Sequence, residues 1–160
     1  HDFDLARYYA GSDDFNSLFA TGKYFTDKKL KKVKDLELAT VLMKSRKGVL
    51  CIITNSRHCS FGYDQRIELF GSKGMIISDN QRDQETSFYS KNSTNNKSTF
   101  KNFFIERYSE AYKIQLNDLA KLCKKNIKPL ANFEDGRLSL ILAETANKSL
   151  KTKKLEKIKF

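Results

Sequence analysis

Apolar side chains recur at helical spacing near the start of the chain and in its second half, and come in short runs between. Residues 2–10 (DFDLARYYA) place apolar side chains on one face, with two aspartates in the opening turn, where carboxylates favour the helix dipole. Gly11 follows as a natural stop. From residue 16 to residue 91 the apolar runs are short and bounded by turn residues. The pattern predicts one helix, a series of strands and two longer helices.

Two pairs of apolar runs in the middle of the chain predict hairpins. LATVLMKS (38–45) and GVLCIITNS (48–56) meet at the charged turn RKG, and YDQRIELFGS (63–72) meets GMIISD (74–79) at a glycine-containing turn. The polar stretch 92–99 is either a linker or the tip of a long hairpin, because it has nothing to bury. Further strands are expected at 16–25, at 85–91 and, as a short edge strand, in the tail 153–160.

The second half of the chain predicts two long helices. Residues 100–125 form the first, and Pro129 ends the connection that follows. Residues 132–150 form the second, with Asp135 as the expected N-cap. The inner stripe of the first helix is Phe104, Tyr108, Tyr112, Leu116, Leu119 and Cys123, and that of the second is Leu138, Ile141, Leu142, Thr145 and Ala146.

These elements predict an α+β fold. A single domain over residues 1–160 is expected, with one mostly antiparallel open sheet and the two long helices packed on one of its faces. The strands at 38–45 and 48–56 are apolar toward both faces, so both faces need a cover. We expect a second copy of the chain to cover the free face, with a charge at Val41 or Ile53, whichever faces outward, weakening the assembly.

Composition narrows the function classes. The net charge is +11, but the lysines are scattered, and the densest run (28–34) falls in an expected exposed loop without a nucleic-acid-binding motif. No apolar run is long enough to span a bilayer and no secretory signal is visible, so we expect a cytoplasmic protein without membrane or nucleic-acid partners. Three widely spaced cysteines indicate neither a disulfide framework nor a metal site; Cys51 and Cys123 are expected in the core.

Candidate chemistry is sparse. The chain has no glycine-rich phosphate loop and no hydrolase or zinc-protease motif, and its only histidines are His1 and His58. An imidazole, with an ordinary pKa of about 6.5, suits a base working near neutral pH. Without further context a terminal histidine is simply solvated. Asp4 lies one helical turn after His1, so the two side chains can point to the same side.

Four segments together resemble the C-terminal portion of inositol 2-dehydrogenases of the glucose-fructose oxidoreductase (Gfo/Idh/MocA) family. They are HDFDLARYYAG, ITNSRHCSFGYDQRIELFGSKGMI (53–76), FIERYSEAYKIQLNDL (104–119) and DGRLSLILAETANKSL (135–150). The stretches 27–36 and 92–99 do not match and are expected to be variable surface. The resemblance implies that the chain is a C-terminal substrate-binding and oligomerisation part, truncated at the junction with a nucleotide-binding domain.

The resemblance also implies a partial site. His1 matches the family's catalytic histidine, whose partner aspartate would lie just upstream of residue 1 and whose partner lysine would lie further upstream. Asp4 either hydrogen-bonds substrate hydroxyls or is a carboxylate at the helix start that interacts with the helix dipole. Tyr63 either reaches the polyol or packs as a strand-end aromatic. Asp2 is expected to have a structural role. Asn55 and Arg57 either form hydrogen bonds at the surface or line the mouth of the pocket. No role is expected for His58 or Cys59.

The implied function is oxidation of a secondary alcohol of an inositol or related polyol to a ketone, with hydride transfer to NAD. The choice between NAD and NADP stays open, because the residue that reads the ribose would lie in the other domain. No residue of the chain is expected to bind the cofactor or a metal. The isolated chain should be inactive and should form dimers or tetramers. The alternative, from another class, is a stand-alone assembly or binding module that kept the sheet and lost catalysis.

Overall fold

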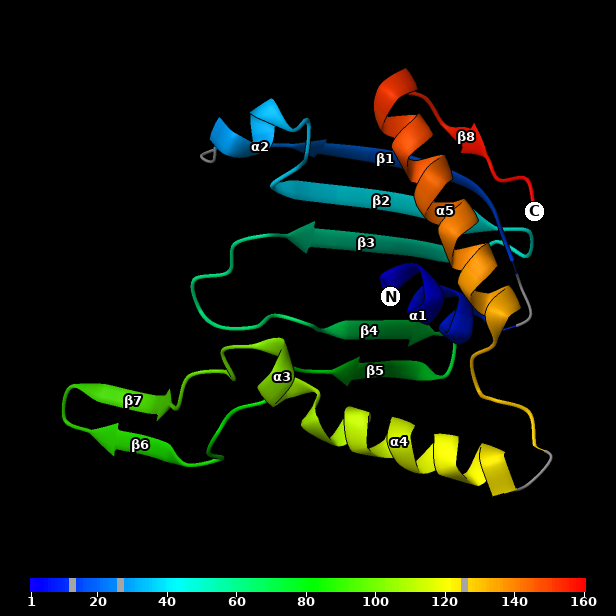
Figure 1. The fold of residues 1–160 in the computed structure, drawn as a ribbon. Coiled ribbons are helices and arrows are strands. Elements are labelled where there is room, and N and C mark those ends of the chain that lie inside the picture. The colour runs from blue at the N-terminus through cyan, green and yellow to red at the C-terminus, as the bar shows by residue number, and fades with distance from the viewer. Residues whose placement is uncertain (12–13, 26–27, 125–126) are drawn as a thin grey trace. The chain divides into compact units, whose positions relative to one another are not determined.

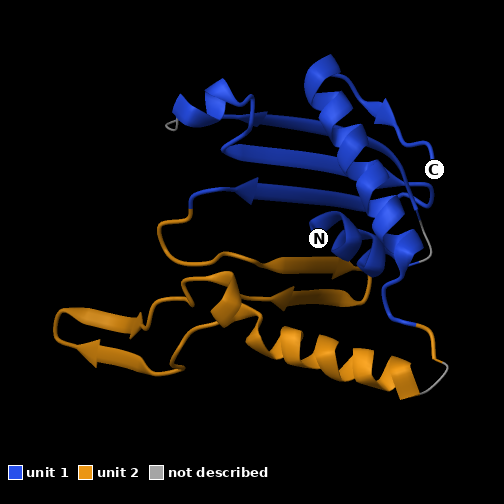
Figure 2. Cartoon of the chain, viewed as in Figure 1, with its two compact units in different colours: residues 1–58, 129–160 blue, residues 59–128 orange. Residues whose placement is uncertain are grey.

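The computed structural model describes residues 1–11, 14–25, 28–124 and 127–160, as five helices and eight strands (Figure 1). The chain divides into two compact units, residues 1–58 with 129–160 and residues 59–128 (Figure 2). None of the described helices is long and apolar enough to cross a membrane. Unit 1 contains α1 (Asp2–Ala10), β1 (Phe15–Lys23), α2 (Lys28–Lys32), β2 (Leu38–Ser45), β3 (Leu50–Ser56), α5 (Phe133–Thr152) and β8 (Glu156–Lys157).

Unit 1 is built on a four-stranded antiparallel sheet in the order β3-β2-β1-β8. Helices α1 and α5 lie on the same face of this sheet (Figure 1). The core forms between that face and the helices, where Leu18, Met43 and Leu142 are fully buried and Ala6 and Ala10 of α1 pack against them. The predicted α+β class is confirmed, because helices cover one face of an open antiparallel sheet.

The opposite face of the four-stranded sheet, here called the outer face, carries an apolar row. Phe19, Leu42 and Ile52 are cross-strand partners on β1, β2 and β3. Leu42 is 43% exposed and Ile52 is 70% exposed. The apolar character of both faces is therefore confirmed, and the cover for the outer face stays a prediction. Val41 and Ile53 both point toward the helices, so the residues whose charge would test the cover are Leu42 and Ile52.

Unit 2 contains two antiparallel hairpins and two helices. Gly74, which opens the second strand of the first hairpin, has a φ of 137°, a conformation that side chains with a Cβ rarely adopt. Arg82 and Phe100 form an isolated antiparallel bridge, with the guanidinium 4.1 Å from the ring centroid. The elements are β4 (Ile67–Gly71), β5 (Gly74–Ser78), β6 (Ser87–Ser90), β7 (Ser93–Lys97), α3 (Phe104–Arg107) and α4 (Ser109–Lys124).

The prediction of one sheet covered by the two long helices is wrong in its details. The strands form three separate sheets, and the four-stranded sheet is covered by α1 and α5. The polar stretch 92–99 is not a linker, because β7 pairs with β6. The first long helix is divided at Tyr108, whose φ of −110° and ψ of 14° leave the helical region. Cys123 is exposed, although Cys51 does pack against the core as expected.

Two helix boundaries also differ from the sequence prediction. The N-cap of α5 is Asn132, and Asp135 occupies the third helical position of a capping box in which each side chain bonds the other's backbone. The lysine-rich stretch 27–36 contains the short helix α2 and buries Leu30, so it is not a plain exposed loop. Residue 125, which the prediction placed at the end of the first long helix, lies outside the described residues.

Candidate functional site

Helix α1 presents His1 at its start. His1 is the N-cap of the helix, and its carbonyl oxygen accepts the N–H of Leu5 at 2.9 Å. The imidazole is exposed and makes no capping hydrogen bond to the helix. The ring is therefore accessible for a proton-transfer role, with its backbone held by the first turn of α1.

The carboxylate of Asp4 lies one turn further along α1 and faces α5. The Ser139 hydroxyl donates to its Oδ1 at 3.4 Å, and the Arg7 guanidinium lies 4.0 Å from the same oxygen. Arg7 also pairs with Asp135 at 3.4 Å, which joins α1 to the first turn of α5. The Asp4 side chain remains 45% exposed, so these contacts hold it while leaving it open to a ligand. Both interpretations of Asp4 from the sequence remain open.

Asp2, on the helix position next to His1, contacts β3. The Asn55 side-chain amide donates to Asp2 Oδ2 at 2.8 Å. Asn55 shares its face of β3 with Ile53 and Cys51, which pack against the core, and it is the register partner of Ala39 on β2. The sequence interpretation of Asp2 as structural gains a specific partner, 53 residues away along the chain.

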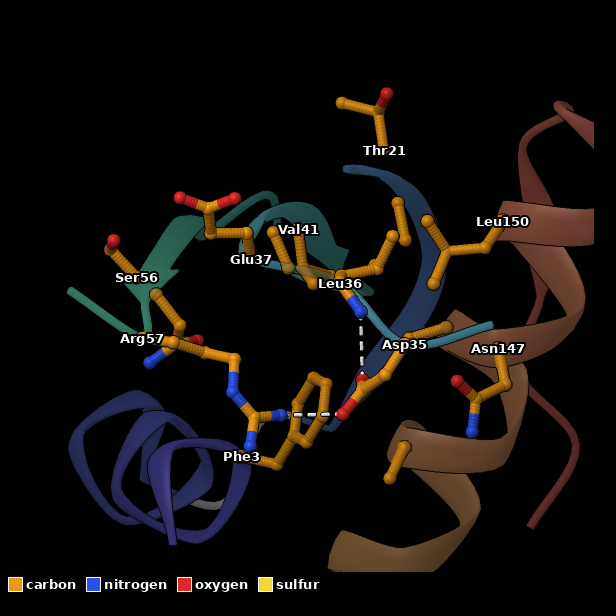
Figure 3. A pocket seen from close by; sticks show the side chains of 15 residues that line it. Phe3, Thr21, Asp35, Leu36, Glu37, Val41, Ser56, Arg57, Asn147 and Leu150 are labelled. Carbon is orange, nitrogen blue, oxygen red and sulfur yellow. Dashed lines mark hydrogen bonds and ion pairs between the residues drawn. The ribbon is translucent and has the colours of Figure 1, made fainter. Parts of the chain in front are cut away.

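A cavity of about 320 Å³ lies between α1, the sheet and α5 (Figure 3). Phe3, Val41 and Leu150 contribute apolar walls, while Asn55 and Arg57 contribute polar ones. The Arg57 guanidinium donates to Asp35 Oδ2 at 2.5 Å, and Figure 3 draws this ion pair beside Phe3. Asn55 and Arg57 line this cavity and also form side-chain hydrogen bonds, so both alternatives from the sequence remain open. His1 and Asp4 are not among the residues that line it.

Tyr63 lies in unit 2, at the start of the segment that leads into β4. Its N–H donates to the Lys101 carbonyl at 2.8 Å, and its half-buried ring packs edge-on against Tyr108 with centroids 5.8 Å apart. Gly62 has a φ of 120°, and a Cβ there would lie 3.0 Å from the Phe100 Cβ. The preceding glycine is therefore required by both conformation and space. Tyr63 thus packs against Tyr108 rather than at the end of a strand, and its polyol role stays a prediction.

The residues after Tyr63 form a polar network that the sequence analysis did not anticipate. Arg66 donates to both carboxylate oxygens of Asp64, at 2.7 and 2.9 Å, and Asn80 donates to Asp64 as well. The hydrogen bond from Arg66 is the main cause that lowers the pKa of Asp64 below its usual range, and Asn80 adds to it. The i, i+2 spacing of Asp64 and Arg66 is a sequence signal for their ion pair. The contact of Asn80 with Asp64 depends on the fold and has no such signal.

The structure therefore places His1 and Asp4 with Asp2 and Arg7 at α1. Asn55 of β3 and Ser139 of α5 contact this helix. Tyr63 belongs to the other unit and is described by its own surroundings. His58 and Cys59 are exposed. Among the residues that the structure describes, no group of three or more His, Cys, Asp or Glu side chains could hold a metal ion.

The fold is that of dehydrogenases of known structure. A myo-inositol dehydrogenase from Corynebacterium glutamicum superimposes with a TM-score of 0.93 and 36% identity, over 100% of this chain and 47% of that one. The "Myo-inositol 2-dehydrogenase" of Thermotoga maritima is 39% identical over 158 residues, which are 99% of this chain and 47% of the relative. The "scyllo-inositol 2-dehydrogenase (NAD(+))" of Bacillus subtilis is 25% identical, over 94% of this chain and 43% of the relative.

Residues 1–77 match the family model of the GFO/IDH/MocA C-terminal domain. The similarity to this family, which the resemblance implied, extends beyond these residues, because the relatives and the solved structure align with 94% or more of the chain. It spans about half the length of the curated relatives that it matches.

Proposed function

We propose that this chain supplies the substrate-binding part of an NAD-dependent inositol 2-dehydrogenase, which oxidises a secondary alcohol to a ketone. The observation that carries the proposal is His1, exposed at the start of α1 with the Asp4 carboxylate one turn away. Support comes from the 39% identity to the Thermotoga maritima enzyme over nearly the whole chain.

His1 serves as the general base. Oxidation of a secondary alcohol requires that the hydroxyl proton leave as the C–H bond of the same carbon breaks. A nitrogen of the His1 imidazole accepts that proton, and a neutral imidazole is available for this role near neutral pH. The exposure of the ring and its freedom from helix capping suit it to meet a substrate hydroxyl.

Asp4 and Tyr63 bind the polyol. The Asp4 carboxylate accepts hydrogen bonds from substrate hydroxyls, with its orientation held by Ser139 and Arg7. The Tyr63 hydroxyl reaches the polyol while its ring is held against Tyr108. A polyol needs several such partners, because each buried hydroxyl that lacks a hydrogen bond weakens binding.

The residues of this chain do not fit a dinucleotide by themselves. No glycine-rich turn joins a strand to a helix N-terminus in the described ranges, and that turn is the usual cradle for the pyrophosphate. We therefore assign no residue of the chain to NAD and expect its site elsewhere in the full-length protein. When bound there, NAD supplies the acceptor for the hydride. The name of the Bacillus subtilis relative favours NAD over NADP.

The outer face of the sheet joins copies of the chain into a dimer or tetramer. The row of half-buried Phe19 with exposed Leu42 and Ile52 supports this, because a monomer rarely leaves such a row open. The same row also favours the second candidate, an assembly module without catalysis. The two candidates differ in turnover and agree in self-association.

The test is an assay of the full-length protein that contains this chain, with NAD and either myo-inositol, scyllo-inositol or an acyclic polyol as substrate. The absorbance of NADH measures turnover. We expect turnover with at least one inositol isomer. The 160-residue chain alone, assayed in parallel, should give none. Self-association without turnover of any inositol by the full-length protein would favour the assembly module instead.

A further inference from the structure

The start of α1 has no side-chain cap. The first N–H groups of any helix lack partners within it, and a side-chain N-cap normally supplies one. The His1 side chain supplies no such bond. The Leu5 N–H holds the His1 carbonyl, and contacts of the first turn with the rest of unit 1 add to the placement of His1.

Beneath the first turn of α1, an apolar contact lies beside a cavity. Phe3 packs against the core and also lines, with Asn55, the cavity of about 320 Å³ (Figure 3). The far end of α1 differs, because Ala6 and Ala10 pack against the core and Arg7 pairs with Asp135 on α5. At the end that carries His1, the apolar contact comes from Phe3, which borders the cavity.

Asn55 supplies a polar contact at this end. Its amide donates to Asp2 Oδ2 at 2.8 Å, one residue from His1, and a carboxylate acceptor makes such a bond stronger than a neutral one. β3 is held in the sheet along its length, because it pairs with β2 from Leu50 to Ser56. The bond therefore links the first turn of α1 to the sheet.

We infer that Asn55 is a positioning residue, which sets the placement of the His1 base through Asp2. This inference rests on the proposed function, since it takes His1 as the base. Misplacement of a reacting group by about 1 Å can cost on the order of 10²-fold in rate. Loss of the Asn55 bond should therefore lower kcat while leaving substrate and NAD binding nearly intact.

The test uses the full-length protein, with kcat, KM for the inositol and Kd for NAD measured for each variant. Asn55→Ala should lower kcat about tenfold, with KM and Kd within about twofold of the parent. Asn55→Asp should lower kcat further, because two carboxylates then face each other. Asn147→Ala is the matched control, because Asn147 lines the same cavity from α5 (Figure 3), and its kcat should be unchanged.

A swapped pair separates positioning from a general loss of structure. Asp2→Asn alone leaves two amides that can still bond, so its kcat should stay within about threefold of the parent. Adding Asp2→Asn to Asn55→Asp restores a donor–acceptor pair of reversed polarity and should recover most of the lost kcat. Thermal unfolding of every variant establishes that each one is folded.

The outcomes distinguish this inference from the proposed function. If His1→Ala abolishes turnover but Asn55→Ala and Asn55→Asp keep the parental kcat, the positioning role is wrong and the proposed function stands. The role is equally wrong if the swapped pair gains nothing over Asn55→Asp. If His1→Ala retains full turnover, both fail, because there is no base to position.

Discussion

The Ser149 hydroxyl accepts a hydrogen bond from the Ala20 N–H at 2.9 Å and donates one to the Lys154 carbonyl at 2.7 Å. β8 pairs with β1 only at Ser17 and Leu18, so Ala20 lies beyond the last edge pair. The fully buried Ser149 thus completes the hydrogen bonding of β1 and holds the chain as it leaves α5 toward β8.

Replacing this serine should destabilise the fold. Ser149→Ala leaves a buried N–H and a carbonyl without this partner, and we expect a loss of about 2 kcal/mol in the free energy of unfolding. Urea unfolding of the chain measures it. Ser109→Ala, at an exposed hydroxyl with a contact of 3.4 Å to the Glu106 carbonyl, is the control and should change the free energy little. Equal effects of the two variants would contradict the role given to Ser149.

Asp64 predicts a pH dependence of stability. Its pKa is lowered in the folded chain, mainly by the hydrogen bond from Arg66, so its contribution is present above the unfolded pKa of about 4. The contribution is lost as pH falls through the lower folded pKa. Asp64→Asn removes it, so the free energy of unfolding of the parent should fall more steeply than that of the variant on acidification below about pH 4. Parallel curves for the two proteins would show that the network adds nothing.

Self-association should depend on the outer face. Ile52→Glu places a carboxylate in the row formed with Phe19 and Leu42, and should convert dimers or tetramers to monomers at tens of micromolar. Sedimentation equilibrium in moderate salt measures the change. Val33→Glu, at a side chain that is 71% exposed and lies off the sheet, is the control. A parent chain that is already a well-folded monomer would remove the basis for the proposed assembly.

Local pattern predicted much of the fold because each signal involved neighbours in sequence. Asp2–Ala10 and the hairpin of β2 and β3 follow from periodicity and turn residues within about ten positions. Helix α2 was not predicted, because a single buried residue, Leu30, among lysines produces no helical periodicity of apolar positions. At α5, Asn132 and Asp135 are both suitable caps, and only the capping box shows which one starts the helix.

The site was predictable in part. The resemblance singled out His1, and its place at the start of α1 follows from the helical pattern. The bond between Asp2 and Asn55 was not predictable, because it joins positions 53 residues apart and depends on the register of β3. The cavity beside Phe3 likewise depends on how α1, α5 and the sheet pack, which no local pattern specifies.

The central claim is that His1 is the base of an inositol dehydrogenase, and His1→Ala in the full-length protein tests it most directly. The measurement is kcat with the preferred inositol isomer, together with the Kd for NAD. Loss of the general base should lower kcat by about 10²–10⁴-fold, while the Kd for NAD stays within about twofold of the parental value. A His1→Ala variant that turns over at the parental rate would contradict the account.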